Sequence, residues 1–240
     1  MITKELLSQN YNSIRDNVNY LATRYNRNPS DIKILAVSKT QNHHTILKGI
    51  AAGIPIFAES FAQEFRDKYS ELTNFTTNNI QCEFHFIGHL QSNKVKYVVP
   101  HTSTIHTIDS LSNAKEVSKQ ALKFNKTINI LIQINTSAEP NKSGILPESA
   151  RTLSKEILLL PNINLLGLMT IGTFSEDEII IRKEFSMLRE SLLDLNKALG
   201  INLSELSMGM SHDYDIAIQE QATMIRIGTA IFGERKRKEE

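Results

Sequence analysis

A lysine stands at the end of a short apolar segment in the first quarter of the chain. Residues 34–40 read ILAVSKT, and the run from Ile34 to Val37 is typical of a strand buried on both faces. Lysine is seldom buried, because removing an ammonium group from water is costly. The pattern alone leaves two interpretations open: a strand that ends with Lys39 in water, or a reactive amine beside a site.

Two glycine-containing segments near the C-terminus indicate what such an amine could meet. Residues 207–211 read SMGMS and residues 226–229 read RIGT. Glycine lets backbone N–H groups approach an anion, and hydroxyl groups add donors, so both segments suit a phosphate. A neutral lysine amine near a phosphate site suits a Schiff base with a phosphorylated carbonyl compound. Arg226 is the candidate neighbour that would lower the pKa of Lys39.

Short apolar runs alternate with helical patterns along the whole chain. This alternation predicts a parallel sheet, and eight strands in 240 residues predict an α/β fold with a single closed (β/α)8 TIM barrel. An open doubly wound sheet is the alternative, although no G-x-G-x-x-G follows the first strand. The predicted strands are 31–38, 54–58, 83–88, 102–109, 128–135, 163–171, 203–209 and 223–229.

Helical periodicity is clearest in two intervals. Residues 111–124 carry apolar side chains three and four positions apart. A longer helix follows Ser175, which we expect to form a capping box with Glu178, and Gly200 supplies its end.

Composition and the two ends of the chain favour one ordinary cytoplasmic domain. We expect residues 1–240 to form a single domain, with an N-terminal helix in 1–28 and a charged tail at 234–240. A net charge of +1 favours neither nucleic acid nor membrane as a partner. The N-terminus lacks the apolar core of a signal peptide, and the single cysteine, Cys82, excludes an intrachain disulfide. Cys82 has no companion ligand, so we expect no metal site.

In a closed parallel barrel, chemistry takes place at the C-terminal ends of the strands. Polar and glycine residues at several of these ends are therefore candidates for ligand binding, and Glu59 could be either an acid–base group or a structural hydrogen-bond partner. The candidates are Lys39, His85, Met169, Ser207, Met208, Gly209, Arg226, Gly228 and Thr229.

The chain resembles a known family, the pyridoxal phosphate homeostasis proteins (YggS/PROSC). The resemblance is spread over nearly the whole chain, and its segments keep the family's order. They are LAVSKT at 35–40, HFIGHLQSNK at 85–94, IHTID at 105–109, INTSAEPNKSG at 134–144, GLMTIG at 167–172, LSMGMSHDYDIAI at 206–218 and IRIGTAIFGER at 225–235.

The resemblance implies a barrel similar to the N-terminal domain of alanine racemase. It implies pyridoxal 5'-phosphate held as an internal aldimine on Lys39, with phosphate contacts from Ser207–Gly209 and Gly228–Thr229. Arg226 would face the nitrogen of the pyridine ring. Family members are described as cofactor carriers without established turnover, so the implied partners are the cofactor and pyridoxal-phosphate-dependent apoenzymes that accept it.

Three positions depart from the family's pattern. The Gly-Glu-Asn usual after the second strand is Ala58-Glu59-Ser60 here, a tryptophan is replaced by Phe84, and a glycine by Gln221. The change at Ser60 puts any contact made by that asparagine in doubt. None of the three removes Lys39 or the phosphate segments.

A binding protein without turnover is the leading interpretation, and two enzymes compete with it. One is an amino-acid racemase that uses pyridoxal phosphate, and the other is a Schiff-base aldolase that uses Lys39 alone. Arginine cannot accept a proton, so Arg226 would not keep a pyridine nitrogen protonated. In alanine racemase a second base comes from an additional domain; the sequence stops soon after the eighth strand, so we expect no such domain here. We also expect a monomer, because no exposed apolar helix is left over in the pattern.

Overall fold

A closed barrel of eight parallel strands, in the order β1 to β8, forms the centre of the computed structural model, which describes residues 2–75, 82–137, 139 and 141–234. The predicted (β/α)8 barrel is therefore confirmed, and the open doubly wound sheet is wrong. The strands are β1 (Lys33–Val37), β2 (Ile56–Glu59), β3 (Glu83–Phe86), β4 (Thr104–Ile108), β5 (Ile128–Gln133), β6 (Ile163–Met169), β7 (Glu205–Met210) and β8 (Met224–Ile227).

All eight predicted strands are present, with small differences at their ends. β2 and β7 run one residue beyond the predicted ranges, to Glu59 and Met210, and the other six lie inside them. The single domain predicted for residues 1–240 stays a prediction, because residues 235–240 of the charged tail lie outside the described residues.

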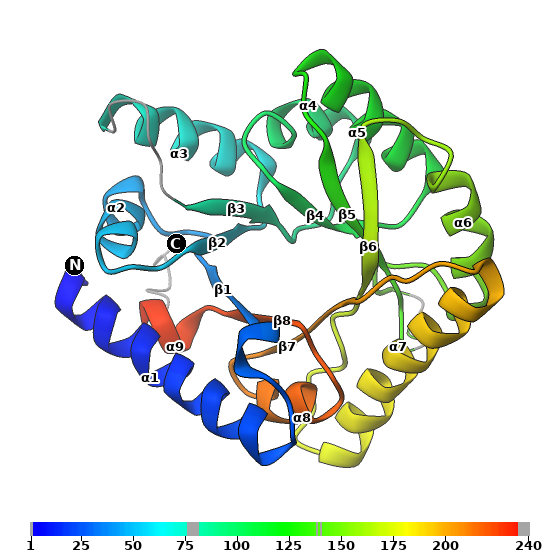
Figure 1. Cartoon of the computed structure of the whole chain (residues 1–240). Coiled ribbons are helices and arrows are strands. Elements are labelled where there is room, and N and C mark those ends of the chain that lie inside the picture. Colours follow the sequence, from blue (N-terminus) through cyan, green and yellow to red (C-terminus); the bar gives the residue numbers. More distant parts are fainter. Residues whose placement is uncertain (1, 76–81, 138, 140, 235–240) are drawn as a thin grey trace.

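Helices surround the barrel, and Figure 1 shows α1 lying along the outside beside α8 and α9. The predicted N-terminal helix is thus present in a shorter form. The helices are α1 (Lys4–Arg24), α2 (His43–Ala51), α3 (Ala62–Phe75), α4 (Val95–Val98), α5 (Leu111–Lys123), α6 (Ala150–Ile157), α7 (Glu178–Leu199), α8 (Tyr214–Gln219) and α9 (Thr229–Phe232), with short 3-10 turns at Pro29–Asp31, Ser92–Lys94 and Pro147–Ser149.

The capping box predicted for α7 is wrong, although the helix is there. Its N-cap is Asp177, whose carboxylate accepts a hydrogen bond from the N–H of Ile179 at 2.9 Å. Ser175 accepts from the N–H of Asp177 instead, at 3.0 Å, so it shapes the turn that leads into the cap. Gly200 ends the helix in the left-handed conformation, with φ at 64°, as predicted.

Side chains alternate across each strand, and this alternation decides what points into the barrel. On β1, Ile34 and Ala36 belong to the large apolar core that includes the surrounding helices, whereas Leu35 belongs to a small cluster on the other face. Val37 packs against that small cluster too. The same alternation, continued past the end of the strand, directs Lys39 toward the mouth of the barrel.

The barrel interior holds an apolar group and a polar group of side chains, and the two adjoin each other, because Leu35 pairs in register with Arg226 and Ala58 with His85. Strands β1, β2 and β8 supply an apolar cluster, together with one residue just after β3; its members are Leu35, Ala58, Ile87 and Met224. The polar group consists of fully or almost fully buried side chains that bond to one another between strands; these are His85, His106, Ser207 and Arg226.

Candidate functional site

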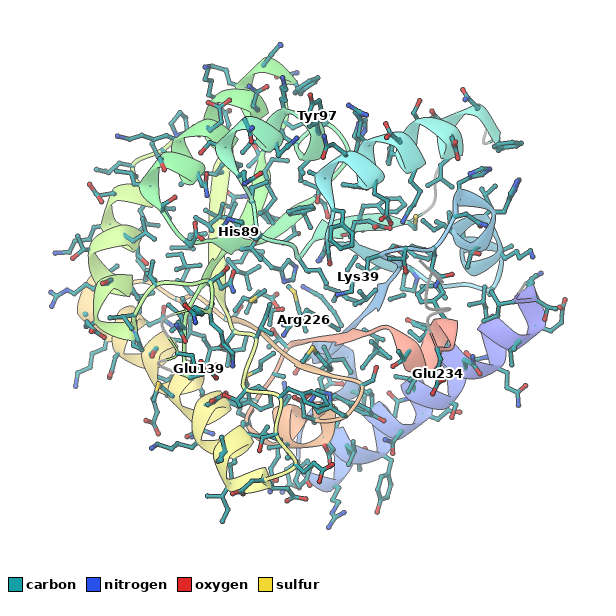
Figure 2. The ribbon with its side chains drawn as sticks, turned by 180° about the vertical axis from the view of Figure 1, so that it is seen from behind. Lys39, His89, Tyr97, Glu139, Arg226 and Glu234 are labelled. Carbon is teal, nitrogen blue, oxygen red and sulfur yellow. The ribbon has the colours of Figure 1, made fainter. Side chains whose placement is uncertain are left out.

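A pocket of about 310 Å³ opens where the C-terminal ends of the strands meet, and it contains Lys39 and Arg226. Figure 2 shows both side chains near the middle of the ring of strands, while Tyr97 and Glu234 lie at its periphery. In the part of the chain that the structure describes, the lining is Val37, Lys39, Ser60, Ile87, Ile171, Phe174, Met210, Ser211, His212, Arg226, Gly228 and Thr229.

Lys39 occupies a tight turn that directly follows β1. The turn is closed by a hydrogen bond from the N–H of Gln41 to the carbonyl of Ser38, at 3.0 Å. The next residue, Thr40, has a φ of 68°, a conformation that few non-glycine residues adopt. The half-buried lysine is therefore presented to the pocket by a backbone that other contacts must hold in place.

Those contacts come from a buried carboxylate behind the turn. Glu59, at the end of β2, is 0% exposed and accepts a hydrogen bond from the Ser38 hydroxyl at 2.6 Å. The ammonium group of Lys68, on α3, pairs with the same carboxylate at 2.7 Å and donates to the Ser38 carbonyl at 3.0 Å. Burial raises the pKa of Glu59, an effect that Lys68 and Ser38 oppose.

Glu64 completes this arrangement from the first turn of α3. Its carboxylate accepts from the N–H of Thr40 at 2.6 Å and pairs with Lys68 at 2.9 Å. We call Ser38, Glu59, Glu64 and Lys68 the lysine-side cluster. The cluster gives Glu59 the structural hydrogen-bond role that the sequence left open, and it ties the Lys39 turn to both β2 and α3.

Arg226 lines a second part of the pocket wall, on strand β8, which pairs with β1. Its side chain is directed inward by the same alternation as Met224 and is only 4% exposed. One terminal nitrogen donates to the hydroxyl of Ser207 at 2.8 Å, and the other donates to the carbonyl of Thr170 at 2.7 Å. Burial lowers the pKa of Arg226 to about 10, partly offset by Asp213, so it stays a cation near neutral pH.

Gly228 and Thr229 line the pocket at the point where β8 passes into α9. Gly228 is the residue before the helix, and the N–H groups of the first turn of a helix have no partner inside it. The predicted phosphate donors of this segment therefore lie in the same pocket as Lys39.

The other predicted phosphate segment reaches the pocket less directly. Ser207 is fully buried and bonds to Arg226, and Met208 packs in the core between barrel and helices. Gly209 has a φ of 91°, and a Cβ there would lie 2.5 Å from the Cβ of Ala217. The close packing of α8 against β7 therefore requires a glycine at position 209. None of the three is among the lining residues that the structure describes, and their binding roles stay predictions.

His85 and Met169 were predicted to lie beside a ligand, and both are buried side chains below the pocket lining. His85 is 2% exposed, with its Nδ1 atom 2.9 Å from Nε2 of His106, and Met169 is 0% exposed. Neither belongs to the described lining. Direct contact with a cofactor therefore stays a prediction for both.

The sequence did not single out two aromatic side chains at the mouth of the pocket. His212 follows the SMGMS segment and pairs with Asp213 at 3.2 Å. The ring of Phe174 lies 4.9 Å from that of His212 and is 82% exposed. The position of His212, immediately after a predicted phosphate segment, was the signal that could have revealed it.

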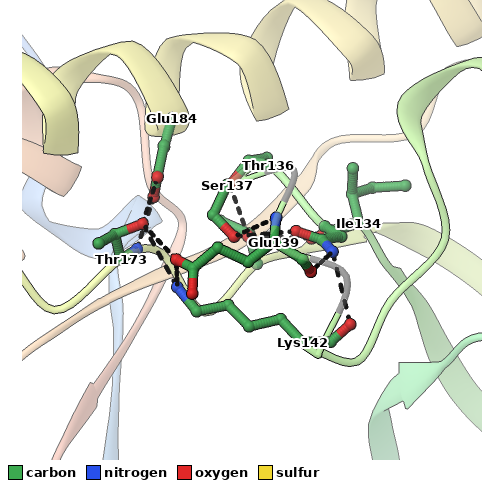
Figure 3. Close-up of polar contacts among 9 residues, drawn as sticks. Ile134, Thr136, Ser137, Glu139, Lys142, Thr173 and Glu184 are labelled. Atoms are coloured by element: carbon green, nitrogen blue, oxygen red, sulfur yellow. Dashed lines mark hydrogen bonds and ion pairs between the residues drawn. The ribbon is translucent and has the colours of Figure 1, made fainter.

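A further group of polar contacts holds the loop that carries Phe174 (Figure 3). Glu184, on α7, accepts hydrogen bonds from both the N–H and the hydroxyl of Thr173, each at 2.6 Å. Lys142, from the loop after β5, pairs with Glu139 at 2.7 Å and reaches the Thr173 hydroxyl at 3.3 Å. Two loops on this side of the mouth are thereby joined to each other and to α7.

Among the described residues, no helix is long and apolar enough to cross a membrane. The described ranges also contain no group of three or more histidine, cysteine, aspartate or glutamate side chains arranged to hold a metal ion.

Solved structures share this architecture. An unknown protein from Bifidobacterium adolescentis aligns over 97% of this chain and 98% of its own, with a TM-score of 0.87 and 33% identity. PipY of Synechococcus elongatus PCC7942, solved with PLP bound, aligns over 95% of this chain and 100% of its own, with a TM-score of 0.82 and 29% identity. Alanine racemase of Clostridium difficile 630 shares the fold at 18% identity and a TM-score of 0.75, over 99% of this chain and 59% of that one.

Sequence comparison gives the same relationship. The family described as "Alanine racemase, N-terminal domain" matches residues 9–236. The pyridoxal phosphate homeostasis protein of Aquifex aeolicus is 40% identical over 89% of this chain and 91% of its own length. The protein of that name in Escherichia coli K12 is 38% identical over 95% and 97%. The chain therefore belongs to the alanine racemase N-terminal domain family and, within it, to the pyridoxal phosphate homeostasis proteins.

Proposed function

We propose that this protein binds pyridoxal 5'-phosphate at Lys39, holds it reversibly, and releases it to apoenzymes that need it. The observation that carries the proposal is the pocket that brings Lys39 together with Arg226, Gly228 and Thr229 at one end of the barrel. Relatives named pyridoxal phosphate homeostasis proteins, and the structure of PipY with PLP bound, support the same cofactor.

The donor set fits the cofactor in three ways. The amine of Lys39 would be the nucleophile that holds the aldehyde of the cofactor. The Gly228–Thr229 segment offers N–H and hydroxyl donors for a phosphate. Arg226 offers a buried cationic donor for a ring nitrogen and cannot itself take a proton from it.

Pyridoxal phosphate supplies an aldehyde for capture by an amine and, in enzymes, a ring that accepts electrons. In this pocket Lys39 would be the residue that captures it, and Arg226 would orient the ring without protonating its nitrogen. An arginine in that position favours holding the cofactor over deep stabilisation of a carbanion.

The departures from the family's pattern leave the pocket usable. Ala58 lies in the apolar cluster inside the barrel, outside the described lining. Ser60 does line the pocket. Its carbonyl oxygen packs against Gly88, where an added Cβ would lie only 1.8 Å from that oxygen. Gln221 has a φ of 74°, which explains why a glycine is usual at that position, but it lies at the other end of the barrel.

Loading and transfer test the proposal. The purified protein is incubated with pyridoxal phosphate, freed of unbound cofactor by gel filtration, and mixed with a pyridoxal-phosphate-dependent apoenzyme. We expect a yellow protein, eluting as a monomer, that restores activity to the apoenzyme, and a Lys39→Ala variant that does neither. A colourless protein that cannot be loaded would contradict the proposal and favour the aldolase alternative.

Racemisation is the second candidate, because the described lining of the pocket also contains an imidazole that can act as a base. Racemisation needs a base on each face of the substrate carbon, and His212 lines the pocket together with Lys39. The loaded protein should be incubated with single-enantiomer amino acids. We expect negligible loss of optical rotation; a robust loss that disappears in both Lys39→Ala and His212→Asn would establish the racemase instead.

A further inference from the structure

Five side chains form a continuous chain of contacts through the barrel, from its N-terminal end to the pocket. Arg226 bonds to Ser207 at 2.8 Å, Ser207 to Nδ1 of His106 at 2.9 Å, and Nε2 of His106 to Nδ1 of His85 at 2.9 Å. This series of contacts ends at Glu83, whose carboxylate lies 3.4 Å from Nε2 of His85. Because β4 and β7 are not neighbours, the bond between His106 and Ser207 crosses the interior.

The two end residues of this series of contacts differ in their hydrogen-bonding capacity. Glu83 is the first residue of β3 and, when ionised, can only accept hydrogen bonds. Arg226 can only donate. A serine hydroxyl and neutral imidazoles can both donate and accept, so when both rings are neutral the acceptor-only carboxylate sets the direction of every bond between the two ends.

Starting from Glu83, each hydrogen bond determines which atom of the next side chain carries the proton, for neutral imidazole rings. The carboxylate requires the His85 proton on Nε2, which leaves Nδ1 of His85 as an acceptor. His106 must then donate from Nε2, which leaves its own Nδ1 as an acceptor for the Ser207 hydroxyl. The remaining lone pairs of Ser207 accept the N–H of Arg226. Every bond therefore points from Arg226 toward Glu83.

The surroundings favour a neutral His106 and an ionised Glu83. Burial, together with His85, Arg226 and Lys33, holds the pKa of His106 well below its usual value, so its ring is neutral and carries one N–H. The hydrogen bond with His85 is the main cause that lowers the pKa of Glu83, and burial opposes it. A neutral His106 cannot donate to Ser207 and His85 at the same time.

We propose that Glu83, His85, His106 and Ser207 form a one-way hydrogen-bond relay that positions Arg226 in the pocket. The relay fixes one terminal nitrogen of the planar guanidinium, and the Thr170 carbonyl fixes the other. Two fixed nitrogens leave a guanidinium one orientation, and hence one N–H edge for the pocket. This inference rests on the proposed function, in which Arg226 faces the cofactor ring.

The direction of the relay can be measured without any cofactor. Protein carrying 15N-labelled histidine is studied by NMR, and the rings of His85 and His106 are assigned by the signals lost in His85→Asn and His106→Asn. We expect both rings to be neutral with the proton on Nε2. A His106 ring with its proton on Nδ1, or with two protons, would overturn the proposal.

Glu83→Gln tests whether the carboxylate sets that direction. It removes the acceptor-only end, so we expect mixed tautomers of His85 and His106. The matched control is Glu205→Gln, which removes one charge from the same end of the barrel but contacts Lys33 and Thr223. Unchanged tautomers in Glu83→Gln, or equal changes in both variants, would contradict the relay.

Cofactor retention then links the relay to the pocket. We expect Glu83→Gln to retain pyridoxal phosphate about two- to tenfold less tightly than the wild type, the size of one weakened hydrogen bond, and Glu205→Gln to match the wild type. Equal retention by the wild type and both variants would contradict a positioning role. If the wild type takes up no pyridoxal phosphate, the proposed function fails and the positioning role fails with it, while the tautomers still decide whether the relay runs one way.

Discussion

The two walls of the pocket hold their key side chains by different means. Behind Lys39, the lysine-side cluster is an ion pair with hydrogen bonds, in which Lys68 and Glu59 meet at 2.7 Å and are both almost fully buried. Behind Arg226, the polar contacts run through a serine and two histidines, and a carboxylate, Glu83, stands at the far end of that relay.

This difference corresponds to what each wall must do. A turn with a strained backbone needs strong, non-directional attraction to hold it, and a buried ion pair supplies that. A planar guanidinium needs orientation, which directional hydrogen bonds supply. We therefore expect the lysine-side cluster to dominate stability and the relay to dominate geometry.

The largest expected effect comes from breaking the ion pair with Lys68→Met. The carboxylate of Glu59 would be left buried without its cation, so we expect the free energy of unfolding to fall by about 3–5 kcal/mol. Urea denaturation followed by circular dichroism measures it. Lys33→Met is the control, because its pair with Glu205 involves a lysine side chain that is 44% exposed, and it should cost about 0–1 kcal/mol. Equal losses would contradict the contrast.

A smaller effect is expected from cutting the relay with Ser207→Ala. The terminal N–H of Arg226 and the Nδ1 atom of His106 would each lose a partner in a buried site. Leaving buried polar groups unpaired costs about 1–3 kcal/mol, measured by the same denaturation experiment. A loss as large as that of Lys68→Met would show that the relay, too, is mainly a stability element.

The pH dependence of stability distinguishes the two walls further. The folded-state pKa of His106 lies well below its usual 6.5, so below that pH the unfolded chain binds a proton that the folded chain does not. Stability is therefore lost as the pH falls below about 6.5, by about 1.4 kcal/mol per pH unit from this residue. Denaturation curves at about pH 7.5 and about pH 5.5 should show this loss in the wild type and a shallower one in His106→Asn. An identical pH slope would refute it.

The smallest effect is expected at the exposed edge of the mouth. Lys142 is 30% exposed and its partner Glu139 is 52% exposed, so water screens their attraction. Lys142→Met should change the free energy of unfolding by about 0–1 kcal/mol. Thermal denaturation is sufficient to measure this, and a loss above 2 kcal/mol would mean that the loops around Thr173 hold the barrel together.

The fold was accessible from the sequence because its signals are local and repeated. The run ILAV at 34–37 is apolar over its whole length and INILIQ at 128–133 over most of it, as is typical of strands covered on both faces. Their number and alternation with helices then determined the barrel. The cap of α7 was misplaced because Ser175 and Asp177 are both good capping residues, and only the path of the loop selects between them.

Four of the nine candidate residues could be placed in the pocket in the same way, since residues at the ends of parallel strands gather at one end of a barrel. Lys39, Arg226, Gly228 and Thr229 share the pocket for this reason. Met208 does not line the pocket. It follows the inward-facing Ser207 on β7, so its side chain points to the other face of the strand and packs against the helices.

The relay could not be predicted, because it depends on which side chains meet across the interior. His85 and His106 are 21 residues apart, and His106 and Ser207 are 101 apart, so no spacing in the sequence relates them. Lys68 was missed for a related reason: its position on α3 is that of an ordinary helical lysine, and only the fold brings it against Glu59.

Trapping the captured aldehyde tests most directly whether Lys39 is the reactive group. The protein is loaded with pyridoxal phosphate, reduced with borohydride, digested, and mapped by mass spectrometry. We predict that the pyridoxyl mass lies on the peptide containing Lys39 and is absent from Lys39→Ala. A mass on another lysine, or none at all, would contradict the assignment of Lys39 as the residue that holds the cofactor.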